Sequence, residues 1–199
     1  MVSARRAAFA AGLALVAIAL LPPLHHLSFE SLLMHLVQNV LLAEWAPLLL
    51  VLGLEPQLAH RLADRISLWW ALPLWVGTYY LWHVPLLYDA ALRHPSTLLQ
   101  LEHVCYLAAG IVFWLPLVHG RYPDGVKAGY VFAAFLAMSP LGLLLALLPR
   151  PVYDYYDGHW GLSALADQQL AGIAMSSAEA IVFFAAFAFY VRRAMSDAA

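Results

Sequence analysis

Long apolar runs, separated by short charged or proline-containing breaks, follow one another along the whole chain. Six of these runs approach the ~20 residues that a helix needs to cross a bilayer core of roughly 30 Å. They cover residues 7–21, 29–52, 68–87, 98–118, 126–148 and 165–191. The pattern predicts an all-α fold: a polytopic integral membrane helical bundle with about six transmembrane helices, in a single domain over residues 1–199.

The composition is that of a chain whose solvent is lipid. Of the 199 residues, 64% are hydrophobic and 11% are charged, whereas an ordinary soluble domain is about half apolar and a quarter charged. The net charge of -2 and the few Lys and Arg residues argue against a nucleic-acid partner, which would need a clustered basic surface. The single cysteine, Cys105, excludes an internal disulfide and a CxxC metal or redox motif.

The basic residues predict the orientation of the bundle, because Lys and Arg accumulate in cytoplasmic loops. In a six-span arrangement, one side holds Arg5, Arg6, Arg61, Arg65, Arg121, Lys127, Arg192 and Arg193, and the other holds only Arg93 and Arg150. Both termini are therefore expected to be cytoplasmic. The first run is interpreted as a retained helix, since no clear small-residue cleavage site follows it.

Three histidines fall near the outer ends of three different runs. His35 lies one turn before Asn39, His83 lies close to the end of the third run, and His103 follows Glu102 in the fourth. At about 1.5 Å per residue, the three reach depths within ~5 Å of one another. An unpaired polar group in hydrocarbon costs several kcal/mol, so we expect each histidine to have a partner.

A set of neutral imidazoles with few carboxylates suits copper, zinc or iron. Glu102 or Asp167 would then orient an imidazole, as carboxylates commonly do around metal-bound histidine. For any single histidine, an interhelical hydrogen bond or a place at the membrane interface explains the sequence equally well. His25 and His26, in the first outer connection, are weaker metal candidates, because water-facing loops accept histidine freely.

Two further expectations concern the same side of the membrane. Ser28 is a plausible N-cap of the second helix, and Asp167 stands at the mouth of the last helix, where it would cap that helix or reach a histidine. The tyrosine-rich connection over residues 151–167 is interpreted as an interfacial segment, because aromatic side chains favour the headgroup region.

The polar motifs together resemble the CtaG family of cytochrome c oxidase assembly factors, of the kind associated with caa-type oxidases. The resemblance covers roughly residues 25–193. It rests on Met34-His35-Leu36-Val37-Gln38-Asn39, Ala46-Pro47-Leu48-Leu49, Trp82-His83-Val84-Pro85, Tyr88-Asp89-Ala90-Ala91, Leu101-Glu102-His103 and Asp167-Gln168-Gln169-Leu170-Ala171-Gly172. The chain departs from the family pattern at Asn39, where a second histidine is expected. Either His25 or His26 then serves instead, or metal binding is lost or altered.

The resemblance implies a non-enzymatic role in oxidase assembly, with copper as the metal. Its expected partners are cytochrome c oxidase subunits, an extracytoplasmic copper chaperone and membrane lipid, in a multi-pass protein of the bacterial cytoplasmic membrane. At matching positions the resemblance singles out His35, His83, His103, Glu102 and Asp167. His25 and His26 are further metal candidates, and Asn39, Asp89 and Gln168 are expected to support the site.

Two other functions remain open from the sequence. One is a haem-binding membrane electron carrier with two of these histidines as axial ligands, and the other is a metal-free assembly scaffold. A zinc hydrolase with Glu102 as base ranks below both, since the chain has no HExxH motif.

Overall fold

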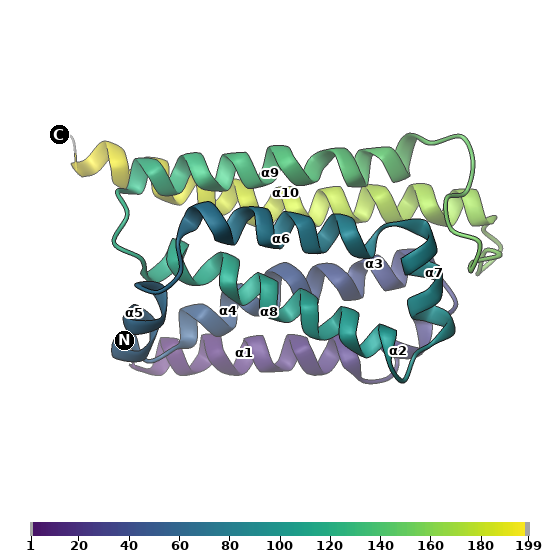
Figure 1. Ribbon diagram of the computed structural model, residues 1–199, viewed down its shortest axis with the longest axis horizontal. Coiled ribbons are helices and arrows are strands. Elements are labelled where there is room, and N and C mark those ends of the chain that lie inside the picture. The colour runs from purple at the N-terminus through teal and green to yellow at the C-terminus, as the bar shows by residue number, and fades with distance from the viewer. Residues whose placement is uncertain (1, 198–199) are drawn as a thin grey trace.

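Helices make up most of residues 2–197, the part of the chain that the computed structural model describes, and that part contains no strand. Several long helices lie side by side as a bundle (Figure 1). In chain order the elements are α1 Val2–Leu20, α2 Leu24–Leu27, α3 Leu32–Val40, the π-helical segment η1 Leu41–Trp45, α4 Ala46–Gly53, α5 Pro56–Ala63, α6 Leu68–Trp82, α7 Pro85–Arg93, α8 Leu98–His119, α9 Asp124–Leu147 and α10 Ala164–Asp197.

Within residues 2–197, five segments are long and apolar enough to cross a membrane: α1, the continuous run from α3 through η1 to α4, α8, α9 and α10. They correspond to five of the six expected spans. The remaining segment, α6, has 15 residues, which is shorter than the ~20 that a perpendicular span needs. It still runs lengthwise in the bundle, in contact with α8 and α9 (Figure 1).

The packing is that of a protein surrounded by lipid, with apolar side chains outside and polar ones inside. Trp69 is 79% exposed and Leu86 is 83% exposed. In contrast, polar side chains with almost no exposed surface point into the bundle, among them Ser31, His35, Gln38, Asn39, Glu44, Glu102, Asp167, Gln168 and Glu179. Their hydrogen bonds have to be made within the protein, because hydrocarbon offers none.

The π-helical segment η1 interrupts the continuous run from α3 to α4, and neighbouring helices hold it in place. The wide turn of η1 presents two backbone carbonyls to other helices: Ala43 O accepts from Trp75 Nε1 at 3.2 Å, and Glu44 O accepts from Trp114 Nε1 at 3.0 Å. Helix α8 lies so close at this point that a Cβ on Gly110 would overlap the carbonyl oxygen of Ala43. The absence of a side chain at Gly110 therefore permits the contact.

Both termini lie at one end of the bundle (Figure 1). At this end, which we call the basic end, Gly53 packs against Phe9 and Arg193 pairs with Asp124. The opposite end, which we call the histidine end, is formed by α2, the start of α3, α7, the start of α8 and the connection over residues 148–163 (Figure 1).

Two expected helix boundaries are wrong. Ser28 is not the N-cap of α3; it is the C-cap of α2. Ser31 is the N-cap of α3, and its hydroxyl accepts from Met34 N at 3.4 Å. The third apolar run also divides: α6 ends at Trp82, and Pro85 begins α7, because proline suits the first turn of a helix.

Candidate functional site

Asp167, at the start of α10, holds the start of α3. Its Oδ1 accepts from Ser31 Oγ at 2.8 Å and from Leu33 N at 3.3 Å, and its Oδ2 accepts from Leu32 N at 2.7 Å. A carboxylate is well suited to this place, because the first amide groups of a helix have no partner within the helix and carry partial positive charge. Asp167 therefore caps a different helix from the one expected, and it positions His35 one turn later.

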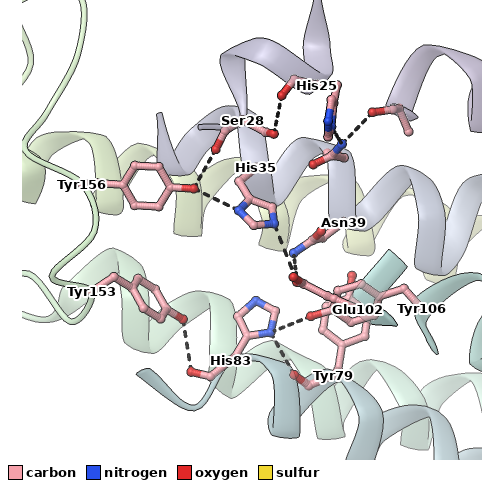
Figure 2. Close-up of polar contacts among 12 residues, drawn as sticks. His25, Ser28, His35, Asn39, Tyr79, His83, Glu102, Tyr106, Tyr153 and Tyr156 are labelled. Atoms are coloured by element: carbon pink, nitrogen blue, oxygen red, sulfur yellow. Dashed lines mark hydrogen bonds and ion pairs between the residues drawn. The ribbon is translucent and has the colours of Figure 1, made fainter. Parts of the chain in front are cut away.

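The ring of His35 is oriented by the connection that precedes α10. Tyr156 donates its only hydroxyl proton to Ser28 O at 2.7 Å, and burial raises the pKa of Tyr156, so the phenol stays protonated. The 2.9 Å contact between His35 Nδ1 and Tyr156 Oη must then be donated by the imidazole (Figure 2). In a neutral ring, His35 Nε2 consequently carries a lone pair.

Glu102 on α8 faces that lone pair. Its Oε1 lies 3.6 Å from His35 Nε2 and accepts from Asn39 Nδ2 at 3.1 Å, whereas Oε2 has no protein partner within residues 2–197 (Figure 2). His35, Asn39 and Glu102 are all fully buried. A lone pair and a carboxylate oxygen repel each other unless a proton or another cation lies between them. The pair is therefore built to hold positive charge.

One ring nitrogen of His83 forms hydrogen bonds, and the other has no partner within residues 2–197. As the C-cap of α6, it directs Nδ1 at Tyr79 O (2.8 Å), and Tyr106 Oη lies 3.2 Å from the same nitrogen. Nδ1 is thus the protonated nitrogen. Nε2 finds no partner in the described chain, and Figure 2 shows it on the side of the ring that faces His35.

Tyr88 on α7 contacts both imidazoles. Its ring centroid lies 5.0 Å from that of His35 and 5.8 Å from that of His83, and Tyr153 stacks on it at 4.0 Å. His35 and His83 therefore share one aromatic neighbour, and their free Nε2 atoms lie in the same part of the histidine end.

His103 lies with the histidines of α2 instead. It is 3% exposed, and both of its ring nitrogens lack partners within the described range. Its ring centroid is 6.2 Å from that of His25, and the ring of His26 follows at 6.4 Å from His25. Partial burial lowers the pKa of His25, and the charges of His26 and His35 add to the effect.

The histidines do not converge on one point. Among the side chains of residues 2–197, no three from His, Cys, Asp and Glu lie close enough together to hold a metal ion as they stand. The arrangement consists of His35 with Glu102 and His83 around Tyr88, and of His103 with His25 and His26. Cys105 on α8 is a free, partly buried thiol.

The connection over residues 148–163 covers the histidine end and is firmly attached. Asp89 on α7 accepts from Asp154 N at 3.1 Å and from Tyr155 N at 3.3 Å. Gln168 accepts from Val152 N at 2.6 Å and donates to Arg150 O at 3.2 Å. Asp89 and Gln168 thus hold the covering segment and do not contact a histidine.

Sequence reasoning missed two sets of residues. Tyr153 and Tyr156, assigned to the membrane interface, are buried against the histidines; the hydroxyl of Tyr153 donates to His83 O at 3.3 Å (Figure 2). Glu44 and Glu179, in the middle of apolar runs, are buried too. For the two glutamates the signal was available, since an ionisable residue inside a membrane helix is expensive and usually functional.

Comparison with known proteins gives one match. A family model described as "Cytochrome c oxidase caa3 assembly factor (Caa3_CtaG)" matches residues 1–197. No curated protein matches the chain, and no solved structure matches it.

Proposed function

We propose a function from one premise: the chain belongs to the family of cytochrome c oxidase caa3 assembly factors. The family indicates that it acts in assembly of the oxidase. We propose further that it does so without catalysis, by holding a copper ion at the histidine end and presenting it to a haem-copper oxidase. Copper is here the cargo of the protein.

One observation carries the copper proposal, namely the set of buried nitrogens that lack protein partners. His35 Nε2, His83 Nε2 and both ring nitrogens of His103 are of this kind. Leaving buried polar atoms unpaired costs free energy, so a fold that retains several of them at one end has a reason to do so. Imidazole nitrogens suit copper, and Glu102 beside His35 supplies the negative charge that favours a bound cation.

The charge distribution supports an orientation for this site. The helix ends and loops at the basic end hold most of the Arg and Lys residues, and such residues accumulate on the cytoplasmic side of a membrane. We therefore propose six spans, with α6 as the short third one, both termini in the cytoplasm of a bacterial cell, and the histidine end facing outward from the cytoplasmic membrane. Copper would arrive there from an extracytoplasmic chaperone and leave to an oxidase subunit.

A metal-free scaffold is the second candidate, and a specific contact favours it. Asn39 satisfies Glu102 Oε1 by a hydrogen bond, so a single proton shared between His35 and Glu102 completes this group without metal. In that case the histidine end contributes shape and hydrogen bonding to the oxidase complex, and no ion transfer takes place.

The test is the copper content of detergent-purified protein loaded with Cu(I) under reducing conditions. We expect His35→Ala and His83→Ala each to lose most of the bound copper, whereas His94→Ala, an exposed histidine at the same end, keeps it. Equal copper in all three variants would refute the copper site. Absence of copper from the unmutated protein would favour the scaffold, and a Soret band in its absorption spectrum would favour haem binding.

A further inference from the structure

A second buried polar group lies deeper in the bundle than the histidines. It consists of Glu44 in η1, Tyr79 on α6 and Glu179 on α10, which are all 1% exposed or less. The hydroxyl of Tyr79 donates to Glu44 Oε1 at 3.1 Å. Glu44 follows Asn39 by five positions, so it lies roughly 8 Å further along the continuous run from α3 to α4.

Glu179 is an independent observation at this place, because it comes from another helix. Helix α10 contacts η1, and the two carboxyl groups are close enough for the charge of one to act on the other. Neither oxygen of Glu179 has a hydrogen-bond partner between residues 2 and 197, and Glu44 Oε2 has none either. Three buried carboxyl oxygens are therefore available to a ligand.

The two indoles beside Glu44 bond to the backbone and not to its carboxyl group, whose Oε2 has no partner within residues 2–197. The indoles of Trp75 and Trp114 hydrogen-bond to the carbonyls of Ala43 and Glu44, not to the carboxylate. These bonds fix the π-helical turn that bears Glu44. Single π-helical turns inside α-helices are rare and frequently lie at functional sites.

No basic side chain neutralises the two carboxylates within the described structure, where no ion pair includes either of them. The helices packed around η1 bring other groups: α6 brings the phenol of Tyr79, and α8 brings the indole of Trp114. The hydroxyl of Tyr80 on α6 instead donates to Ala137 O on α9. Helix α4 has no ionisable residue. The Arg5 and Arg6 pair of α1 lies at the basic end.

Two neighbouring carboxylates in such surroundings cannot both be ionised. Each charge lacks a counter-ion, burial penalises it, and the two charges repel. A proton on one carboxyl group removes the repulsion between them and one of the two unpaired charges, while Tyr79 still donates to Glu44.

We propose that Glu44, Glu179 and Tyr79 form an intramembrane proton-binding site, in which at least one of the two carboxyl groups holds a proton that can be taken up and released. The ligand is the proton itself. The two carboxyl groups are not among the proposed copper ligands, so this proposal does not depend on copper binding; Tyr79 lies between the two groups, since its ring also stacks on that of His83. Tyr79 is a positioning residue: it fixes Glu44, and its backbone carbonyl accepts from His83 Nδ1 at 2.8 Å.

The experiment is infrared spectroscopy of the full, copper-free chain in detergent or lipid at neutral pH, with exchange into heavy water to identify the stretching band of protonated carboxyl groups. We expect the unmutated protein to show this band, and Glu44→Gln and Glu179→Gln each to remove or reduce it. Glu30→Gln, which changes an exposed carboxylate at the histidine end, should leave it unchanged. Tyr79→Phe should shift the band without removing it.

Two results would overturn the proposal. One is the absence of a protonated-carboxyl band from the unmutated protein at neutral pH, which requires no variant to fold. The other is an unchanged band in both glutamine variants when their circular dichroism matches that of the unmutated protein. Glutamine keeps the size of glutamate and resembles its protonated form, so both variants should remain folded.

Discussion

The Nε2 atom of His35 lies 3.6 Å from Oε1 of Glu102, and the two side chains have no exposed surface. The direction of the Tyr156 hydrogen bonds assigns the ring proton to Nδ1, which leaves Nε2 to face a carboxylate. A proton or a metal ion satisfies the pair, and these two occupants compete for the same place. We therefore expect copper binding at this pair to release the proton that the pair holds, because a metal ion binds the deprotonated forms of imidazole and carboxylate.

Tyr156→Phe should weaken copper binding about tenfold, because partners that orient a metal-binding histidine are typically worth 10- to 100-fold in affinity. The substitution removes the hydroxyl that receives His35 Nδ1, so that the imidazole can turn and exchange its protonated nitrogen. A Cu(I) titration against a competing chelator measures the effect. Tyr155→Phe is the matched control, since Tyr155 is adjacent and less buried; equal affinity in both variants would contradict the orienting role.

Asn39→His should increase the retention of copper against the same chelator. Asn39 Nδ2 is 3.1 Å from Glu102 Oε1, so an imidazole at this position would lie beside Glu102 and one turn from His35. Asn39→Leu is the comparison, because it removes the hydrogen bond to Glu102 and supplies no ligand. If histidine and leucine at position 39 gave the same copper retention, the site would lie elsewhere.

Asp167→Ala should lower the free energy of unfolding by about 3 kcal/mol, because a charged acceptor is lost and buried donors are left unsatisfied. Three donors at the start of α3 bond to this carboxylate. Denaturant unfolding in mixed micelles, followed by circular dichroism, measures the loss. Asp157→Ala, an exposed position in the covering segment, should change little. A similar stability of the two variants would show that the cap is dispensable.

Gly110→Ala should destabilise the bundle by about 2 kcal/mol, the usual range for forcing extra atoms into a packed interior. The new Cβ would overlap the carbonyl oxygen of Ala43 and push α8 away from η1. Thermal unfolding in detergent provides the measurement. Gly77→Ala on α6 is the control, because a Cβ there meets nothing within 4 Å and alanine favours a helix over glycine; its stability should be equal or higher.

The helices could be predicted from the sequence because a long apolar run in lipid forms a membrane-spanning helix. The expected run over residues 98–118 agrees with α8, whereas α1 begins before the expected residue 7, α10 continues past the expected residue 191, and the third run divides at Pro85. Helix ends that depend on distant partners could not be predicted. Ser28 and Ser31 are equally good N-caps by local sequence, and the choice is made by Asp167, 136 residues away from Ser31.

In the candidate site, too, the residue types could be predicted from the local sequence, but their partners on distant segments could not. Glu102 was expected to accompany a histidine, and it does so, but its partner is His35 across the bundle and not the adjacent His103. The roles of Tyr153 and Tyr156 follow from the path of the covering segment, which Asp89 and Gln168 fix by bonds to its backbone. Backbone amides that donate to distant side chains leave no signature in the sequence of their own segment, so the sequence gives no sign of this path.

The cap on α3 also has a consequence for how the protein is made. Helix α3 leaves the ribosome long before residue 167 does, and the partner of His35, Tyr156, is equally late in the chain. His35 therefore lacks both the cap on its helix and its own hydrogen bond until Tyr156 and Asp167 have been synthesised. Biosynthesis thus imposes an order: a nascent chain that stops short of residue 167 has inserted most of its helices and still lacks an oriented His35.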